Sequence, residues 1–167
     1  HGSVAVLTKK KGEDSNTSWA QGGICCVSAP EDSFESHVAD TLDAGAGLCD
    51  EDVVRMIVEA APNTIAELVS HGVEFDREAD GDFSLGKEGG HSKRRILHAK
   101  DITGHEIERA LLNAVAAQPN IMIFENHLAI DLITSQKLGY VGENRCLGAY
   151  VFDNKTQAVE TFVAPKT

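Results

Sequence analysis

Residues 86–95 read GKEGGHSKRR and concentrate charged side chains around two glycines. Glu88 precedes the glycine pair, and His91 follows it together with three cations at positions 93–95. A carboxylate beside several cations suits a zwitterionic ligand, with Glu88 facing an ammonium group and the cations facing carboxylates. Composition alone favours a plainer interpretation, a solvated charged loop. The rest of the chain must decide between the two.

A second polar segment, SNTSWAQGGI at residues 15–24, combines small hydroxyl and amide side chains with two glycines. A ligand can approach glycine backbone closely because no Cβ intervenes. Hydroxyl groups and backbone N–H groups suit a phosphate or a ring rich in hydrogen-bond acceptors, and Trp19 could cover such a ring. The alternative is a polar turn that leads into a buried segment. The chain contains no G-x-G-x-x-G fingerprint.

The remaining motifs argue for structural roles. His105 and Glu106 begin an H-E pair, but Arg109 stands where H-E-x-x-H needs a histidine. His98 and Asp101 could form an orienting pair, with a structural hydrogen bond as the simpler use. None of the four cysteines sits in a C-x-x-C pair, so the sequence predicts no metal site. The adjacent pair at 25 and 26 is expected to be small buried side chains in a reducing compartment.

Composition excludes several classes of protein. The chain has 167 residues, 42% of them hydrophobic, and a formal net charge of −11. That size is enough for one hydrophobic core, and the acidic balance argues against nonspecific nucleic-acid binding. No apolar run approaches the roughly 18 residues needed to span a bilayer, and no apolar signal segment opens the chain. We therefore expect a cytoplasmic protein. Its abrupt ends suggest part of a larger one.

The apolar pattern predicts an α/β fold. SVAVLT at residues 3–8 is typical of a buried parallel strand. Capping boxes at Asp32/Glu35 and Thr103/Glu106 predict helix starts, as do Asp50 and Pro62. Strands are expected at 121–124 and 128–134, followed by a hairpin of CLGAYVFD and AVETFVA. The predicted core thus ends in an antiparallel β-meander.

Taken together, SNTSWAQGGI, SHVADTLDAGAGLCDEDVV, EGGHSKRRILHAKDITG, QPNI and HLAIDL resemble the L-aspartate oxidases over residues 3–163. These flavoproteins form a branch of the fumarate reductase and succinate dehydrogenase flavoprotein family. The first motif is shared in looser form by the wider family, whereas the EGGHS motif is more specific to aspartate oxidases. The resemblance implies part of a two-dinucleotide, Rossmann-like FAD-binding domain over residues 1–167.

The resemblance also assigns residues. Glu88 matches the acidic residue that orients the substrate, where fumarate reductases usually have glutamine, and His91 is a weaker catalytic candidate. The expected FAD contacts are Lys9, Asn16, Thr17, Ser18, Trp19, Ala20, Gln21, Gly22, Gly23, Leu128 and Ala129. Ala20, Gln21 and Gly22 would lie beside the isoalloxazine, Lys9 near the adenosine ribose, and the residues at 128 and 129 near the adenine.

The implied reaction is oxidation of L-aspartate to iminoaspartate, with FAD reoxidised by oxygen or fumarate, as the first step of NAD biosynthesis. Quinolinate synthase would be the functional partner, in the cytoplasm or in the plastid of a plant. The family's N-terminal glycine-rich turn, its later capping and helical domains and its proton-transfer arginine have no counterpart in this chain. We therefore expect the isolated chain to be inactive and to bind FAD weakly or not at all. The alternatives are a fumarate reductase or succinate dehydrogenase flavoprotein, and a non-catalytic domain that binds a partner protein.

Overall fold

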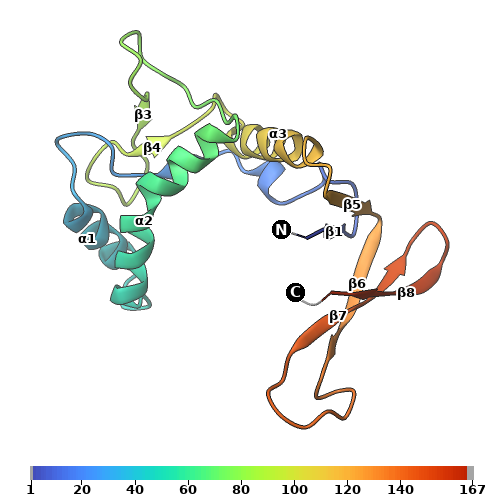
Figure 1. The fold of residues 1–167 in the computed structure, drawn as a ribbon. Helices are drawn as coiled ribbons and strands as arrows, with labels where there is room; N and C mark the ends of the chain where they lie inside the picture. Colours follow the sequence, from blue (N-terminus) through green and yellow to red (C-terminus); the bar gives the residue numbers. More distant parts are fainter. Residues whose placement is uncertain (1, 165–167) are drawn as a thin grey trace. The chain divides into compact units, whose positions relative to one another are not determined.

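A computed structural model describes residues 2–164, which form two compact units (Figure 1). One unit consists of the chain up to residue 14 together with the chain from residue 116 onward. The other unit spans residues 15–115. Among the described residues, no helix is both long enough and apolar enough to cross a membrane. The mixture of helices and strands confirms the α/β prediction.

Two helices, α1 (Phe34–Ala44) and α2 (Glu51–Ser70), pack against each other in the unit of residues 15–115. Asp50 caps α2 as predicted, since its carboxylate accepts the Val53 N–H at 3.2 Å. The predicted Asp32 capping box is wrong. Ser33 caps α1 through Ser36 N–H at 3.1 Å, because the Asp32 carboxylate is bound elsewhere.

Two other predictions about helix starts also need correction, although α3 does begin at Thr103 as predicted. Pro62 lies inside α2, so the two expected helices are one helix of 20 residues. At α3 (Thr103–Ala116), the Thr103 hydroxyl accepts the Ala99 N–H at 3.0 Å. Glu106 accepts the Glu74 N–H at 2.8 Å, so the two side chains serve neighbouring segments rather than forming a capping box. Long-range partners thus replaced the local bonds that the sequence pattern predicted.

A small antiparallel sheet joins the two polar segments. Its strands are β2 (Ile24–Cys25), β4 (Ile96–Leu97) and β3 (Leu85–Gly86), in the order β2-β4-β3. The ladder pairs the end of SNTSWAQGGI with the residues after GKEGGHSKRR. None of these two-residue strands was predicted, because two residues are too short to show an alternating pattern.

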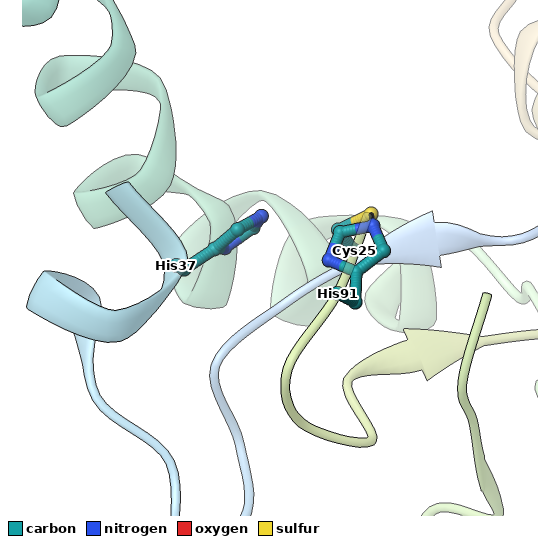
Figure 2. Close-up of side chains that lie close together, drawn as sticks. All are labelled: Cys25, His37 and His91. Atoms are coloured by element: carbon teal, nitrogen blue, oxygen red, sulfur yellow. Dashed lines mark hydrogen bonds between the residues drawn. The ribbon is translucent and has the colours of Figure 1, made fainter. Parts of the chain in front are cut away.

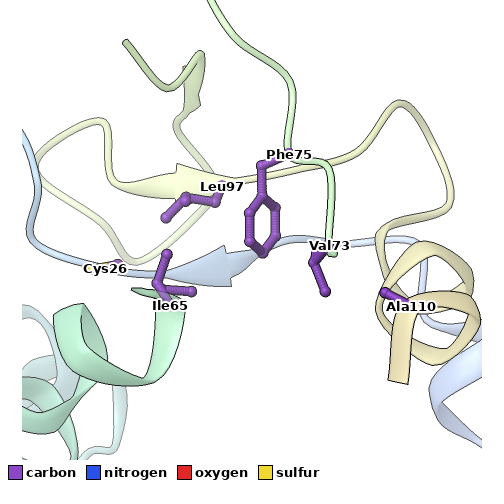
Figure 3. Close-up of a cluster of buried hydrophobic side chains, with 6 residues drawn as sticks. All are labelled: Cys26, Ile65, Val73, Phe75, Leu97 and Ala110. Carbon is purple, nitrogen blue, oxygen red and sulfur yellow. The ribbon is translucent and has the colours of Figure 1, made fainter. Parts of the chain in front are cut away.

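The hydrophobic core of this unit lies between the sheet and the helices (Figure 3). It combines side chains from α2, β4, α3 and the connections after β2 and α2: Cys26, Ile65, Val73, Phe75, Leu97 and Ala110. Removing these apolar groups from water stabilises the platform that carries both polar segments.

In the other unit, the described residues form strands besides the end of α3. Strand β1 (Val4–Thr8) pairs in parallel with β5 (Ile121–Glu125). Val4 and Val6 are 45% and 40% exposed, so the prediction of a buried strand is wrong for this part of the chain. The reason is that β1 has one neighbouring strand among residues 2–164, whereas a buried parallel strand has neighbours on both sides.

Strands β6 (His127–Thr134), β7 (Cys146–Asp153) and β8 (Ala158–Val163) form the predicted antiparallel meander. Phe124 packs edge-to-face on Phe162 with a ring separation of 5.0 Å, and His127 completes this aromatic group. Gln157, at a φ of 58°, marks the sharp reversal between the paired strands β7 and β8, and Asn126, at a φ of 61°, lies between β5 and β6.

Candidate functional site

The SNTSWAQGGI segment is held by α3. Residues Thr17–Trp19 form a single 3-10 turn, η1, and the Ala20 carbonyl accepts the Gly104 N–H at 3.0 Å. A Cβ on Gly104 would overlap the Thr17 carbonyl oxygen, so only glycine allows this approach. The Ser18 hydroxyl also lies 3.3 Å from His105 Nδ1. The start of α3 therefore holds the segment in place.

The outer surface of the same segment is open. Trp19 is 77% exposed, an unusual position for the largest apolar side chain. The backbone from Ala20 to Gly23 is exposed as well. Small side chains, two glycines and an uncovered indole therefore remain available to a planar ligand.

The structure brings Glu88 to this surface. A Cβ built on Gly22 would lie 3.7 Å from Glu88 Oε1, so the carboxylate lies close to the Gly22 backbone. Within residues 2–164, no hydrogen bond or ion pair engages the Glu88 side chain, which leaves both oxygens available to a ligand cation. Two segments more than 60 positions apart thus meet in one site.

Arg95 anchors the Glu88 loop to α1. Its side chain is fully buried and makes a bidentate pair with Asp32, at 2.8 Å from Nε and 2.7 Å from Nη2. Nη1 donates to Asp40 at 2.6 Å, and Nη2 donates to Ser36 at 3.1 Å. With a further contact from Nη1 to His91 Nδ1 at 3.3 Å, all five guanidinium donors have partners.

The charges of this network are fixed by its hydrogen bonds. The pair with Asp32 raises the pKa of Arg95. Burial by itself would raise the pKa of Asp40, but hydrogen bonds from Ser92 and Arg95 outweigh burial and hold the pKa at about 2. Ser92 donates both its N–H and its hydroxyl to Asp40, each at 2.8 Å, so the loop is attached to α1 at two points.

His91 faces inward from the loop. Its Nε2 lies 3.4 Å from the Cys25 sulfur, while its Nδ1 faces Arg95. Burial, and then the charge of Glu88, raise the pKa of the Cys25 thiol. Cys26 is buried as predicted, whereas Cys25 is only half-buried.

Three side chains that were expected to bind a ligand or to pair with a near neighbour have other partners. Arg95 was expected to offer donors to an anionic ligand, but all its donors are used inside the protein. Arg94 donates to the Leu85 carbonyl at 2.7 Å. His98 pairs with Asp76 at 2.9 Å rather than with Asp101, so the acidic loop after residue 75 positions β4.

The other predicted FAD contacts belong to the other unit. Lys9 follows β1 directly, and Leu128 and Ala129 lie on β6 opposite β7. Leu128 is 43% exposed. Their contacts with FAD stay predictions.

Sequence reasoning missed Asp32 and Asp40 as members of the site. Asp32 resembled a helix cap, and Asp40 looked like an ordinary polar position on α1. No local pattern marks the two residues as partners of Arg95, because Asp32 precedes the Ser33 cap and Asp40 lies within α1.

The comparisons with known proteins agree with the geometry. A model of the FAD binding domain matches residues 1–167. The chain belongs to the FAD binding domain family. FAD is the cofactor of this family, and the exposed Asn16–Gly23 surface, with its glycines and uncovered indole, fits a flavin.

Two curated relatives share nearly half of the residues. L-aspartate oxidase 2-a, chloroplastic, from Nicotiana tabacum is 48% identical over 167 residues, covering 100% of this chain and 26% of the relative. L-aspartate oxidase 1 from Ralstonia nicotianae is 48% identical over 169 residues, covering 100% and 32%. The chain thus spans between a quarter and a third of these relatives.

Solved structures of related flavoproteins share the fold. The Mycobacterium smegmatis Sdh1 complex in its apo form superposes with a TM-score of 0.86 at 28% identity, covering 98% of this chain and 29% of that one. A quinol-fumarate reductase with menaquinol molecules gives a TM-score of 0.86 at 27% identity, covering 97% and 27%. These likenesses confirm the prediction of the wider flavoprotein family.

Proposed function

We propose that this chain is the part of an FAD-dependent L-aspartate oxidase that carries the flavin-facing segment and the substrate-orienting loop. The observation that supports the proposal is the Glu88 carboxylate, unpaired and close to the Gly22 backbone. The names of the curated relatives at 48% identity supply the substrate. The complete reaction requires the remaining length of the protein.

In this proposal the residues of the chain divide the work between cofactor and substrate. Asn16–Gly23 hold the flavin, which supplies the chemistry of accepting a hydride from the substrate Cα. Glu88 accepts hydrogen bonds from the substrate ammonium and thereby fixes the direction of the Cα–H bond. Arg95 holds the loop against α1 and does not touch the substrate.

Glu88 also explains selectivity for an amino acid. Succinate and fumarate have two carboxylates and no cation, so an unpaired carboxylate facing them would be repulsive. An amino dicarboxylate adds the ammonium that Glu88 requires.

The product of the proposed reaction would be iminoaspartate. Oxygen or fumarate would then reoxidise the flavin. The reaction would supply iminoaspartate to quinolinate synthase in NAD biosynthesis.

The test is Glu88→Gln in the full native chain with FAD bound. A hydrogen bond between charged partners is worth about 1.5–3 kcal/mol, so kcat/KM for L-aspartate should fall about 10- to 100-fold. Fumarate reduction by the same variant should not decrease, because fumarate has no ammonium group and the substitution removes only the repulsion between Glu88 and its carboxylates. Glu78→Gln, in the exposed acidic loop, is the matched control and should leave both reactions unaltered. Unchanged aspartate kinetics in Glu88→Gln would contradict the proposed role.

A further inference from the structure

Beside the proposed substrate loop, the structure gathers three side chains that can bind a metal ion. Cys25 comes from β2, His37 from α1 and His91 from the loop, and their ligand atoms all lie within 4.8 Å of one another (Figure 2). We propose that these residues form a binding site for a thiophilic divalent cation such as Zn²⁺. The site does not depend on the proposed reaction.

His37 supplies an independent reason. The residue is only 6% exposed, and its Nδ1 is buried without a hydrogen-bond partner, an arrangement that native structures avoid. Figure 2 shows its ring reaching from α1 toward Cys25 and His91. A metal bound through Nδ1 would give this atom the partner that the rest of residues 2–164 does not supply. Burial lowers the pKa of His37, and the charge of Arg95 lowers it further.

The donor set selects the kind of ion. One thiolate and two imidazoles are ligands of Zn²⁺ and related soft cations, and three protein ligands leave a fourth position for water. Bonds of about 2.0–2.3 Å would bring the ligand atoms closer together than they lie now, by roughly 1 Å for the widest pair. The His91–Cys25 pair, at 3.4 Å, already has a separation that a tetrahedral site requires.

The surrounding charges permit a cation despite Arg95. Its guanidinium faces two carboxylates, Asp32 and Asp40, so this buried group is negative in total. Glu88 adds another negative charge near Cys25. When Nε2 of His91 binds a metal, the ring proton must reside on Nδ1. Nδ1 then no longer accepts a hydrogen bond from Arg95, so the 3.3 Å contact is lost. Arg95 keeps its shorter bonds to the two carboxylates.

Binding involves a simple proton balance. The Cys25 thiol gives up its proton to solvent, the sulfur–metal bond forms, and no oxidation occurs. This site revises the sequence-based expectation of no metal site, since its ligands come from three separate segments and show no recognisable spacing.

The experiment uses the full native chain, stripped of metal with a chelator, and titrates it with Co²⁺ and then with Zn²⁺. We expect one Co²⁺ to bind with a thiolate-to-cobalt charge-transfer absorption, and Zn²⁺ to displace it. Cys25→Ser should abolish the absorption, and His37→Gln should weaken binding by at least about 100-fold, more than loss of a supporting neighbour causes. Cys49→Ser removes a half-buried thiol outside the cluster and should leave the titration unchanged.

Circular dichroism establishes that each variant is folded. If Cys25→Ser fails to fold, the titration of His37→Gln tests the proposal by itself. Absence of Co²⁺ binding to the unaltered chain would overturn the proposal. So would a charge-transfer band that survives in Cys25→Ser or disappears in Cys49→Ser.

Discussion

Arg95→Met should be the most damaging single substitution in the site, although Arg95 is not expected to touch substrate. Methionine keeps much of the side-chain volume but removes every guanidinium donor. Asp32 would remain with a fully buried, uncompensated charge. Breaking a buried pair in this way costs about 3–5 kcal/mol in the free energy of unfolding. Asp40 is 17% exposed and can gain water, so it adds less.

Urea unfolding followed by circular dichroism measures this difference. Arg55→Met is the matched control, because Arg55 lies on α2 of the same unit, 40% exposed and 3.7–3.9 Å from three glutamates. Exposed pairs of this kind contribute at most about 1 kcal/mol. A further control is Asp32→Asn in the Arg95→Met background, which removes the stranded charge and should restore part of the lost stability.

If Arg95→Met costs no more than Arg55→Met, the buried network does not anchor the loop and the reasoning is refuted. If Asp32→Asn fails to relieve Arg95→Met, the loss arises from packing rather than from an uncompensated carboxylate.

Three further predictions concern the same unit. Because the pKa of Asp40 is depressed to about 2 from its ordinary 3.8, its contribution to stability is complete above pH 4 and is lost as the pH falls toward 2; acid unfolding curves should show this loss, and Asp40→Asn should remove it. Gly104→Ala should displace the η1 turn, since its Cβ would overlap the Thr17 carbonyl, and equilibrium titration should show weaker FAD binding. Trp19→Ala should change thermal stability little, because the indole is exposed, yet should also weaken FAD binding; equal affinity in the variant would mean that the indole does not cover the flavin.

The parts of the fold that the sequence predicted were those with a local signal. Helix α2 was indicated by its Asp50 cap and apolar stripe, and the hairpin of β7 and β8 by its alternation and turn residues. Pro62 was misread because a proline that can start a helix also occurs within one when its neighbours tolerate a kink.

The errors at Asp32 and His98 share one physical cause, which is competition from distant partners. Asp32 was expected to cap a helix, but a buried guanidinium 63 positions away offers a stronger, charge-assisted bond. In the same way, the His98 side chain pairs with Asp76 instead of with Asp101. The meeting of Glu88 with Gly22 could be inferred only from the resemblance, since the short β2–β4 ladder that joins their segments shows no periodicity.

Cys25, His37 and His91 illustrate the same limit for metal sites. Motif spacing detects ligands that lie close together in sequence, whereas these three converge from a strand, a helix and a loop. The packing of α1 against the loop, through the bonds of Ser92 and Arg95 to Asp40, and the pairing of β2 with β4 bring them together.

The central claim is tested most directly by adding L-aspartate, without oxygen, to the FAD-loaded full native chain and following flavin absorbance. The account predicts that L-aspartate bleaches the flavin and that succinate does not, because only aspartate offers an ammonium to Glu88. Bleaching by succinate but not by L-aspartate would contradict it and would assign the protein to the succinate dehydrogenase type.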